Sequence, residues 1–141
     1  MATVTYNPKQ VLISLGAHAV TGYSDGTFVS IEASGDGITK KTGCDGEVVR
    51  SIDPDDSAKM TLTVLQSSSS VAFAQAQYDK DRATGEGTFP VMVKDLKGGL
   101  LFSAADGWVV KPPTREFAKE STDREIEIDC GSCKFEGEIW K

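Results

Sequence analysis

Apolar and polar residues alternate with a period of two through most of this chain, which predicts strands with one buried face and one solvated face. The alternation is clearest from Arg124 to Cys130, where three small or branched apolar side chains alternate with three acidic ones. The apolar positions are Ile126, Ile128 and Cys130, and the acidic positions are Glu125, Glu127 and Asp129. One face of this strand is therefore expected in a core, and the other is strongly acidic.

The same period, together with glycine, proline and aspartate turn signals, predicts a mainly β fold. Further strands are expected at 10–15, 27–33, 38–42, 47–52, 59–65, 88–95 and 100–110, with a short pairing run at 19–23. Gly98 and Gly99 favour a two-residue hairpin turn, and Gly131 with Ser132 favours another. The second turn is expected to return residues 134–140 along the last strand, with Phe135 and Ile139 as core candidates.

One segment, at about 69–81, has the periodicity of a helix and not that of a strand. Serines precede a run rich in alanine and glutamine, in which Val71, Ala74 and Tyr78 form an apolar stripe at helical spacing. This predicts one α-helix from about Ser69 to Asp81. No other segment of the chain predicts a helix.

Length and charge limit the classes of protein. A chain of 141 residues is the size of one domain, so residues 1–141 are expected to form a single domain. No apolar run reaches the roughly 18 residues of a membrane helix, no secretory signal is visible at the start, and the three cysteines suit a reducing cytoplasm. The net charge of −6 argues against a surface that grips nucleic acid.

Residues 25–51 alternate short strands with glycine-aspartate turns and carry no reactive grouping. This pattern predicts a protruding hairpin arm at about 33–47. Arms of this kind usually contact other molecules, so the segment is interpreted as a scaffold element.

Few residues suggest chemistry, and no catalytic or cofactor-binding residue is expected. Cys130 and Cys133 have the spacing of a redox pair or half a zinc site, and His18 with Cys44 would complete a Cys₃His set. The alternative is that the two cysteines are small apolar residues beside a turn and that His18 lies on the surface. Trp108 and Trp140 could form a carbohydrate platform, although burial in strands also explains them.

The run YNPKQVLISLGAHAVTGYSDGTFVSIEASGDGITKKTGCDGEVVRS and the segments KMTLTVLQSSSS, GEGTFPVMVKDLKGG and WVVKPPTREFAKESTDREIEIDC resemble the phage tail tube proteins of contractile tails. The resemblance covers nearly the whole chain. Its most specific elements are DGTF at 25–28, Gly43 with DGEV at 45–48, TLT at 61–63 leading into Gln66 and Ser67, FPV at 89–91 with Lys94-Asp95, and Phe117-Lys119-Glu120 with Arg124-Glu125.

The resemblance implies an antiparallel β-sandwich or half-barrel with one flanking helix, which completes an inner β-barrel on ring assembly. It implies a structural virion protein, not an enzyme, whose hexameric rings stack into a tube that DNA traverses without specific binding. Tail sheath, baseplate and tail terminator proteins are the expected partners, and assembly is expected in the bacterial host cytoplasm without membrane insertion. The ring-stacking contact would come from an arm that includes Gly35, Asp36, Gly37, Lys40, Lys41, Asp45 and Gly46.

Two polar strand faces are candidates for the wall of the channel. The first comprises Ser30, Glu32, Thr61 and Thr63, because a neutral-to-acidic wall would let DNA pass. The second is the face of Glu125 and Glu127, which could instead contact the surrounding sheath. A different class of protein also fits the pattern, namely a monomeric β-sandwich module that binds a ligand or glycan.

Overall fold

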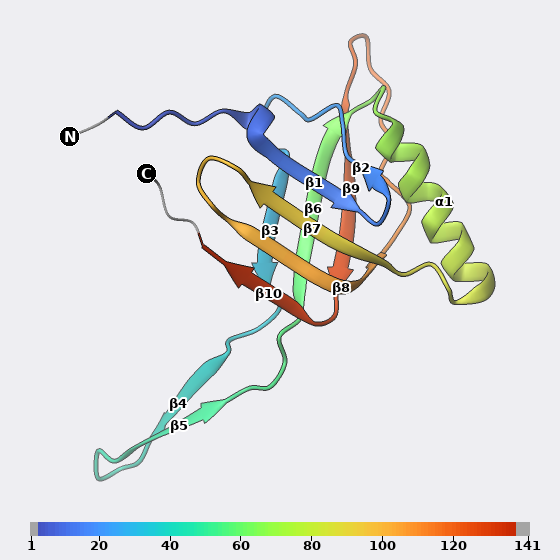
Figure 1. Ribbon diagram of the computed structural model, residues 1–141. Coiled ribbons are helices and arrows are strands. Elements are labelled where there is room, and N and C mark those ends of the chain that lie inside the picture. The colour runs from blue at the N-terminus through green and yellow to red at the C-terminus, as the bar shows by residue number, and fades with distance from the viewer. Residues whose placement is uncertain (1–2, 138–141) are drawn as a thin grey trace.

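The computed structural model describes residues 3–137, which form a mainly β, antiparallel fold with one long helix (Figure 1). A short 3₁₀ turn, Pro8–Gln10, precedes the first strand. The strands are β1 (Val11–Leu15), β2 (His18–Ala19), β3 (Val29–Ala33), β4 (Ile38–Thr42), β5 (Val48–Ile52), β6 (Ala58–Leu65), β7 (Phe89–Asp95), β8 (Leu101–Val109), β9 (Asp123–Cys130) and β10 (Cys133–Glu136), and the helix is α1 (Ser69–Thr84).

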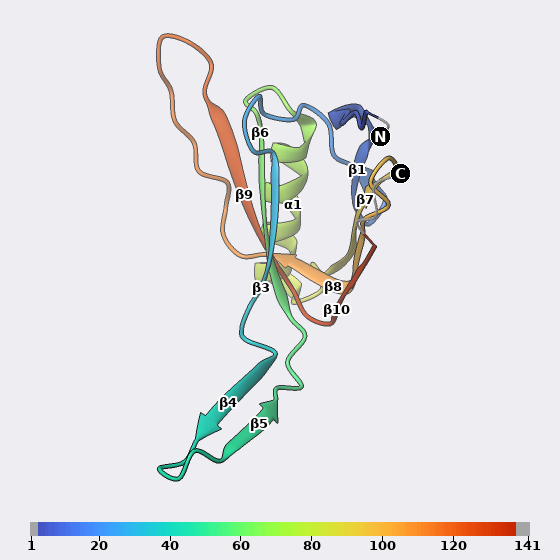
Figure 2. The same cartoon turned by 90° about the vertical axis from the view of Figure 1, so that its left-hand side faces the viewer.

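The strands form one large bent sheet and one separate hairpin. In the large sheet the order is β2-β1-β7-β8-β9-β6-β3, and β10 also pairs with β8. Figure 2 shows the bend: β3, β6 and β9 lie on one side, and β1, β7 and β10 lie on the other. The inner faces of the two halves enclose the core, as in a half-barrel or sandwich.

The bend is made by matching kinks in β8 and in the β9–β10 segment. In β8 the buried positions change from Phe102 and Ala104 to Gly107 and Val109, so two consecutive residues between them are exposed. The β9–β10 segment has a matching pattern, with residues 131 and 132 between Cys130 and Cys133. Cys130 pairs with Gly107 and Cys133 pairs with Ala104, so one register is kept across the kink. Both sides of the bend therefore turn their apolar faces toward the same interior.

The expected hairpin after β9 is wrong. β10 does not return along β9; it continues along β8, because residues 131–132 bend the chain without reversing it. The Gly131 amide donates to the Asp106 carbonyl at 2.8 Å, which holds the bend against β8. Phe135 is half exposed, and its ring centroid lies 4.9 Å from that of the buried Phe102. Ile139 and Trp140 lie outside the described residues.

Helix α1 begins as expected but ends later. The Ser68 hydroxyl caps its first turn by accepting from the Ser70 amide. The helix continues past Asp81 to Thr84, because the left-handed residue that stops it is Gly85, with φ 74°. Ser70 and Ala74 are buried against the sheet, and α1 contacts β8 and β9. No helix in residues 3–137 is long and apolar enough to cross a membrane.

Three loops differ from the expected pattern. The β7–β8 connection is a five-residue loop at 96–100, in which the Leu100 carbonyl accepts from the Asp95 amide, and not a two-residue turn. The pairing run expected at 19–23 is reduced to β2 and an isolated bridge between Tyr23 and Val64. The β4–β5 hairpin extends to Ile52, beyond the arm expected at 33–47, since β5 is its second strand.

The core is continuous across the bend. Strand side chains on the inner faces supply nearly all of it. The largest fully buried ones are Leu15, Met60, Leu62, Val64, Val91, Val93, Phe102, Ile126, Ile128 and Cys130. This set includes Met60, Leu62 and Val64 of β6 and Ile126, Ile128 and Cys130 of β9, which are inward positions of the alternation.

Candidate assembly surfaces

The outer face of the β3-β6-β9 half carries the polar side chains of all three strands. Ser30 pairs with Thr61, and Thr61 pairs with Glu127, so these three form one row across the sheet. Directly opposite residues in antiparallel strands share a face. The two faces that sequence reasoning kept as alternatives are therefore one surface, which we call the polar sheet face.

Two further rows complete the polar sheet face. Glu32 pairs with Lys59 and Lys59 with Asp129, which in turn lies opposite Trp108 of β8. In the other row Thr63 pairs with Glu125. Trp108 is half-buried at the margin of this face.

Acidic groups predominate on this face. The carboxylates of Glu32, Glu125, Glu127 and Asp129 outnumber the ammonium groups of Lys59 and Lys111. Both lysines approach Glu127, with Nζ to carboxylate oxygen distances of 3.7 Å for Lys59 and 3.3 Å for Lys111. Because both lysines are more than half exposed, these pairs contribute little to stability and leave the face weakly negative.

Free strand edges border the polar sheet face on both sides. β3 is the last strand of the sheet order and pairs only with β6. At the other side, β8 pairs with the last three residues of β9, so the first half of β9 has no second partner strand among the described residues. Unpaired edges of this kind are templates for pairing with another chain.

The β4–β5 hairpin projects away from the body as an arm (Figures 1 and 2). Every residue of its two strands is exposed. Lys40 and Lys41 lie in β4, while Asp45 and Gly46 form the turn at the tip, with Gly46 at φ 90°. The other expected contact residues, Gly35, Asp36 and Gly37, lie in the exposed segment that leads into β4.

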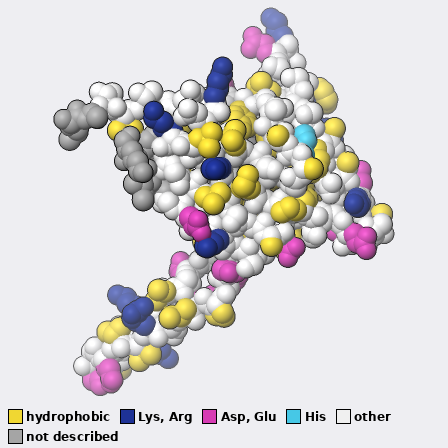
Figure 3. All heavy atoms as spheres, viewed as in Figure 1, with side chains coloured by type: hydrophobic (Ala, Val, Ile, Leu, Met, Phe, Trp, Pro, Cys, Tyr) yellow, Lys and Arg dark blue, Asp and Glu magenta, His cyan; other side chains and the backbone are white. Residues whose placement is uncertain are grey.

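The arm is basic along its strands, although the chain as a whole is acidic. Lys40 pairs directly with Arg50, which places two cations side by side. Figure 3 shows this cluster on the arm, with acidic side chains at the far end. Within residues 3–137, no ion pair involves Lys40, Lys41 or Arg50.

A second protrusion is the loop 110–122 between β8 and β9, at the end of the molecule opposite the arm (Figures 1 and 2). Phe117 in this loop is 80% exposed. Sequence reasoning missed this residue as a surface feature, although its neighbours are all polar or small and no strand period includes it.

The four residues of the possible metal site are not brought together. Cys44 is exposed in the turn of the arm, whereas Cys130 is buried in the sheet. The described residues hold no group of three or more histidine, cysteine or acidic side chains that could bind a metal ion. His18 is partly buried and visible at the surface (Figure 3). Its ring stacks on Phe73 at 4.5 Å, and its Nε2 lies 2.9 Å from the Ser70 hydroxyl.

Cys130 and Cys133 lie on either side of the bend and both face the interior. Burial raises the pKa of the Cys130 thiol from its ordinary 9.0 to about 12, and the neighbouring Cys133 and Asp129 act in the same direction. Burial also raises the pKa of the Cys133 thiol. A reactive redox cysteine needs a lowered pKa, so this pair has the character of buried apolar side chains.

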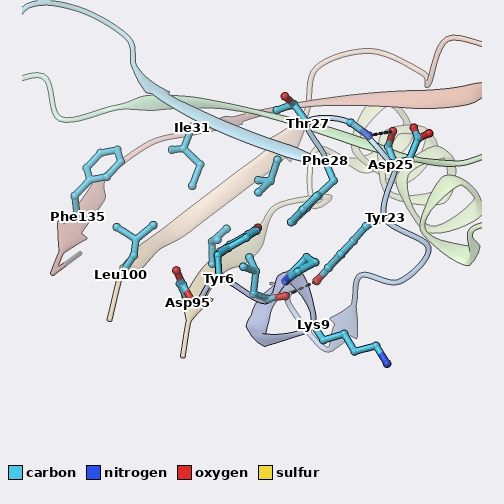
Figure 4. Close-up of a pocket in the computed structure, with 16 residues that line it drawn as sticks. Tyr6, Lys9, Tyr23, Asp25, Thr27, Phe28, Ile31, Asp95, Leu100 and Phe135 are labelled. Atoms are coloured by element: carbon cyan, nitrogen blue, oxygen red, sulfur yellow. Dashed lines mark hydrogen bonds between the residues drawn. The ribbon is translucent and has the colours of Figure 1, made fainter. Parts of the chain in front are cut away.

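An open cavity of about 940 Å³ lies between the two halves of the sheet, at the side away from α1 (Figure 4). Its walls are mostly apolar and aromatic. Tyr23 and Phe28 stack there with ring centroids 4.5 Å apart, and the Tyr23 hydroxyl donates to the Val11 carbonyl at 2.8 Å. Tyr6, Ile31, Leu100 and Phe135 complete the opening. Lys9, Asp25 and Asp95 also line the cavity.

Comparison with known proteins now defines the class. Residues 11–136 match the family described as "Bacteriophage PhiTE tail tube protein". The chain is also 26% identical over 142 residues to "Structural protein ORF10" of Pseudomonas phage KPP10, covering 95% of this chain and 82% of that protein. The protein belongs to this family of phage tail tube proteins.

Solved structures show the same fold at low sequence identity. A chain of the extended sheath/tube terminator of an extracellular contractile injection system, PVC, aligns with a TM-score of 0.66 at 10% identity, covering 96% of this chain and 99% of that one. A chain of the PVC sheath-tube complex aligns at 0.63 and 10% identity, covering 94% and 92%. The cap of the anti-feeding prophage aligns at 0.60 and 10% identity, covering 97% and 95%.

Proposed function

We propose that this protein is the building block of a contractile-tail tube, in which copies close into hexameric rings and the rings stack into a hollow conduit for DNA. Membership of the tail tube family supports this role. The single structural observation that carries it is the polar sheet face bordered by two free strand edges.

Ring closure follows from the two different edges. The free edge of β3 in one copy can pair with the uncovered half of β9 in the next. A contact between unlike surfaces is heterologous, and repeated rotation closes such contacts into a ring. The β3, β6 and β9 strands of all copies then form one continuous inner barrel.

The polar sheet face lines the channel in this arrangement. Ser30, Thr61 and Thr63 supply neutral hydroxyl groups, while Glu32 and the acidic residues of β9 keep the wall weakly negative. A wall of this kind repels phosphates slightly and lets DNA pass without binding. The protein performs no chemistry in this role, and it needs no cofactor.

The arm joins successive rings. It is separate from the body, it is exposed along its whole length, and an isolated two-stranded hairpin is only marginally stable in water. Contact with a copy in the next ring would order it. Sheath, baseplate and tail terminator proteins are the further partners, and the assembled protein lies in the virion tail after assembly in the host cytoplasm.

Negative-stain electron microscopy of the concentrated protein tests this proposal. Rings or tubes with an open centre are expected. A stable monomer at high concentration would contradict it and would favour the other class, a monomeric module that binds a ligand or glycan. Dilute samples are not decisive, because assembly depends on protein concentration.

A further inference from the structure

The two most exposed large hydrophobic side chains of residues 3–137 lie at opposite ends of the molecule. Phe117, in the loop 110–122, is 80% exposed, and Ile52, in β5 of the arm, is 74% exposed. Figures 1 and 2 show that this loop and the arm project in opposite directions. Exposed apolar side chains on protrusions at both ends suit head-to-tail contacts between copies.

The loop around Phe117 is held in place by its own hydrogen bonds. The Thr122 hydroxyl donates to the Glu116 carbonyl at 2.6 Å, and Arg115 reaches the Gln75 side chain of α1 at 3.0 Å. Beneath it, buried Arg124 donates to the Thr122 hydroxyl at 2.7 Å and places its guanidinium carbon 5.3 Å from the centre of the Phe117 ring. The aromatic ring is thus presented on a supported loop.

The base of the arm offers a matching surface. Ile38 pairs with Ile52, and both are more than half exposed. The pair Lys40 and Arg50 lies on the same face, two positions closer to the tip. This face therefore combines an apolar contact with two adjacent cations.

The loop carries both acidic and basic side chains. Glu116 and Glu120 flank Phe117 in the sequence, and Arg115 and Lys119 are the neighbouring cations. Arg115 donates to the Gln75 side chain of α1. Neither glutamate forms an ion pair within the described part of the chain. The carboxylates of Glu116 and Glu120 can pair with the two cations beside the exposed isoleucine pair.

We propose that the loop 110–122 is the receiving surface for the arm of a second copy, with Phe117 packed on Ile38 and Ile52, and with Glu116 and Glu120 facing Lys40 and Arg50. This inference rests on the proposed stacking of rings and names the surface that the arm contacts. The contact uses the base of the arm, so the tip extends beyond the loop along the body of the second copy.

A double-mutant cycle tests the contact. Phe117→Ala and Ile52→Ala are each expected to raise the protein concentration needed for tube formation by about tenfold, since each removes a buried apolar contact. The double variant is expected to need no higher protein concentration for tube formation than the more impaired single variant, because both changes remove the same contact. Additive effects would overturn the proposed pairing.

A charge exchange provides a second, independent test. Lys40→Glu with Arg50→Glu is expected to prevent tube formation, and Glu116→Lys with Glu120→Lys in the same chain is expected to restore it. Failure of the second pair to restore tubes would contradict the proposed receiving surface. Leu96→Ala, half exposed in the β7–β8 loop, is the matched control and should assemble normally.

The outcomes separate this inference from the proposed function. If the unmodified protein forms no rings or tubes, the proposed function fails. If it forms tubes and Phe117→Ala assembles at the unmodified concentration, only the receiving surface is wrong. Thermal unfolding of each unassembled variant checks that the subunit still folds.

Discussion

Burial makes Cys130 a packing residue and not a reactive thiol. Its exposed fraction is 1%, and its thiol pKa is raised to about 12. The thiolate is the reactive form of cysteine, so a thiol with this pKa is almost entirely unreactive near neutral pH. Cys44, in contrast, is exposed in the turn of the arm.

Alkylation should follow this difference. At about pH 8 the raised pKa keeps the Cys130 thiol almost entirely protonated. Iodoacetamide treatment followed by mass spectrometry is therefore expected to label Cys44 in the folded protein and to leave Cys130 unlabelled until denaturant is added. Labelling of Cys130 should stay slow below about pH 12, because the raised pKa keeps most of the thiol protonated. Equal labelling of the two cysteines in the folded protein near neutral pH would show that the bend is open.

Gly107 is the residue that lets β7 and β8 approach closely at the bend. A Cβ atom at this position would lie 2.5 Å from the Val91 Cγ2 atom and 3.4 Å from the Phe89 carbonyl oxygen. Gly107→Ala is expected to lower the free energy of unfolding by about 1–3 kcal/mol, because overpacking a full core forces its neighbours to shift. Chemical denaturation of the unassembled subunit measures this change.

Gly35→Ala is the matched control for Gly107→Ala. A Cβ atom at Gly35 would have no atom within 4 Å. Its stability is therefore expected to stay within about 0.5 kcal/mol of the unmodified protein. Equal stability of both variants would mean that the close approach at Gly107 does not constrain the bend.

At the scale of elements, the arm and the body should differ in local stability. β6 has hydrogen-bonded partners on both sides, whereas β4 and β5 pair only with each other. The cations Lys40 and Arg50 also oppose each other directly across that hairpin. The arm therefore lacks the packing that protects the large sheet.

Hydrogen exchange followed by mass spectrometry measures this difference. In the free subunit, amides of β4 and β5 are expected to exchange rapidly, while those of β6 and β9 stay protected. In assembled tubes the arm amides should become protected as well. Protection of the arm that is the same before and after assembly would exclude it from the contact between rings.

Most elements could be predicted from the sequence, because the alternation in β1, β6, β7 and β9 reports burial on one face of each strand. The inward positions Met60, Leu62 and Val64 follow directly from it, as does the acidic outer face of β9. The capping serines likewise indicated the start of α1. Local patterns of this kind need no knowledge of distant partners.

Pairing between distant strands could not be predicted in the same way. Gly131 and Ser132 look like a hairpin turn locally, but the partner of β10 is β8, about thirty residues away. The two polar faces form one surface because of the register of β6 against β9. The alternation within each strand does not reveal that register. Cys130 and His18 were ambiguous for a related reason, since their roles depend on contacts across the fold.

At the scale of the whole molecule, the charge of the polar sheet face should control the passage of DNA. Glu32→Lys and Thr61→Lys each place a cation on this face. Tubes of either variant are expected to retain added double-stranded DNA at low salt and to release it as the salt concentration rises, since cations that contact phosphates give salt-dependent binding. A filter-binding assay on assembled tubes measures the retention.

Ser69→Lys is the control for added charge, because Ser69 begins α1 and is not part of the polar sheet face. Its tubes should retain no more DNA than unmodified tubes. If Glu32→Lys and Thr61→Lys behave like this control, the polar sheet face does not line the channel.

Helical reconstruction of assembled tubes by cryo-electron microscopy tests the central claim most directly. The account predicts a central channel walled by β3, β6 and β9 of every copy, with the row of Ser30, Thr61 and Glu127 facing the axis. A tube whose channel is lined by β1 and β7, or one in which the polar sheet face lies on the outside, would contradict it.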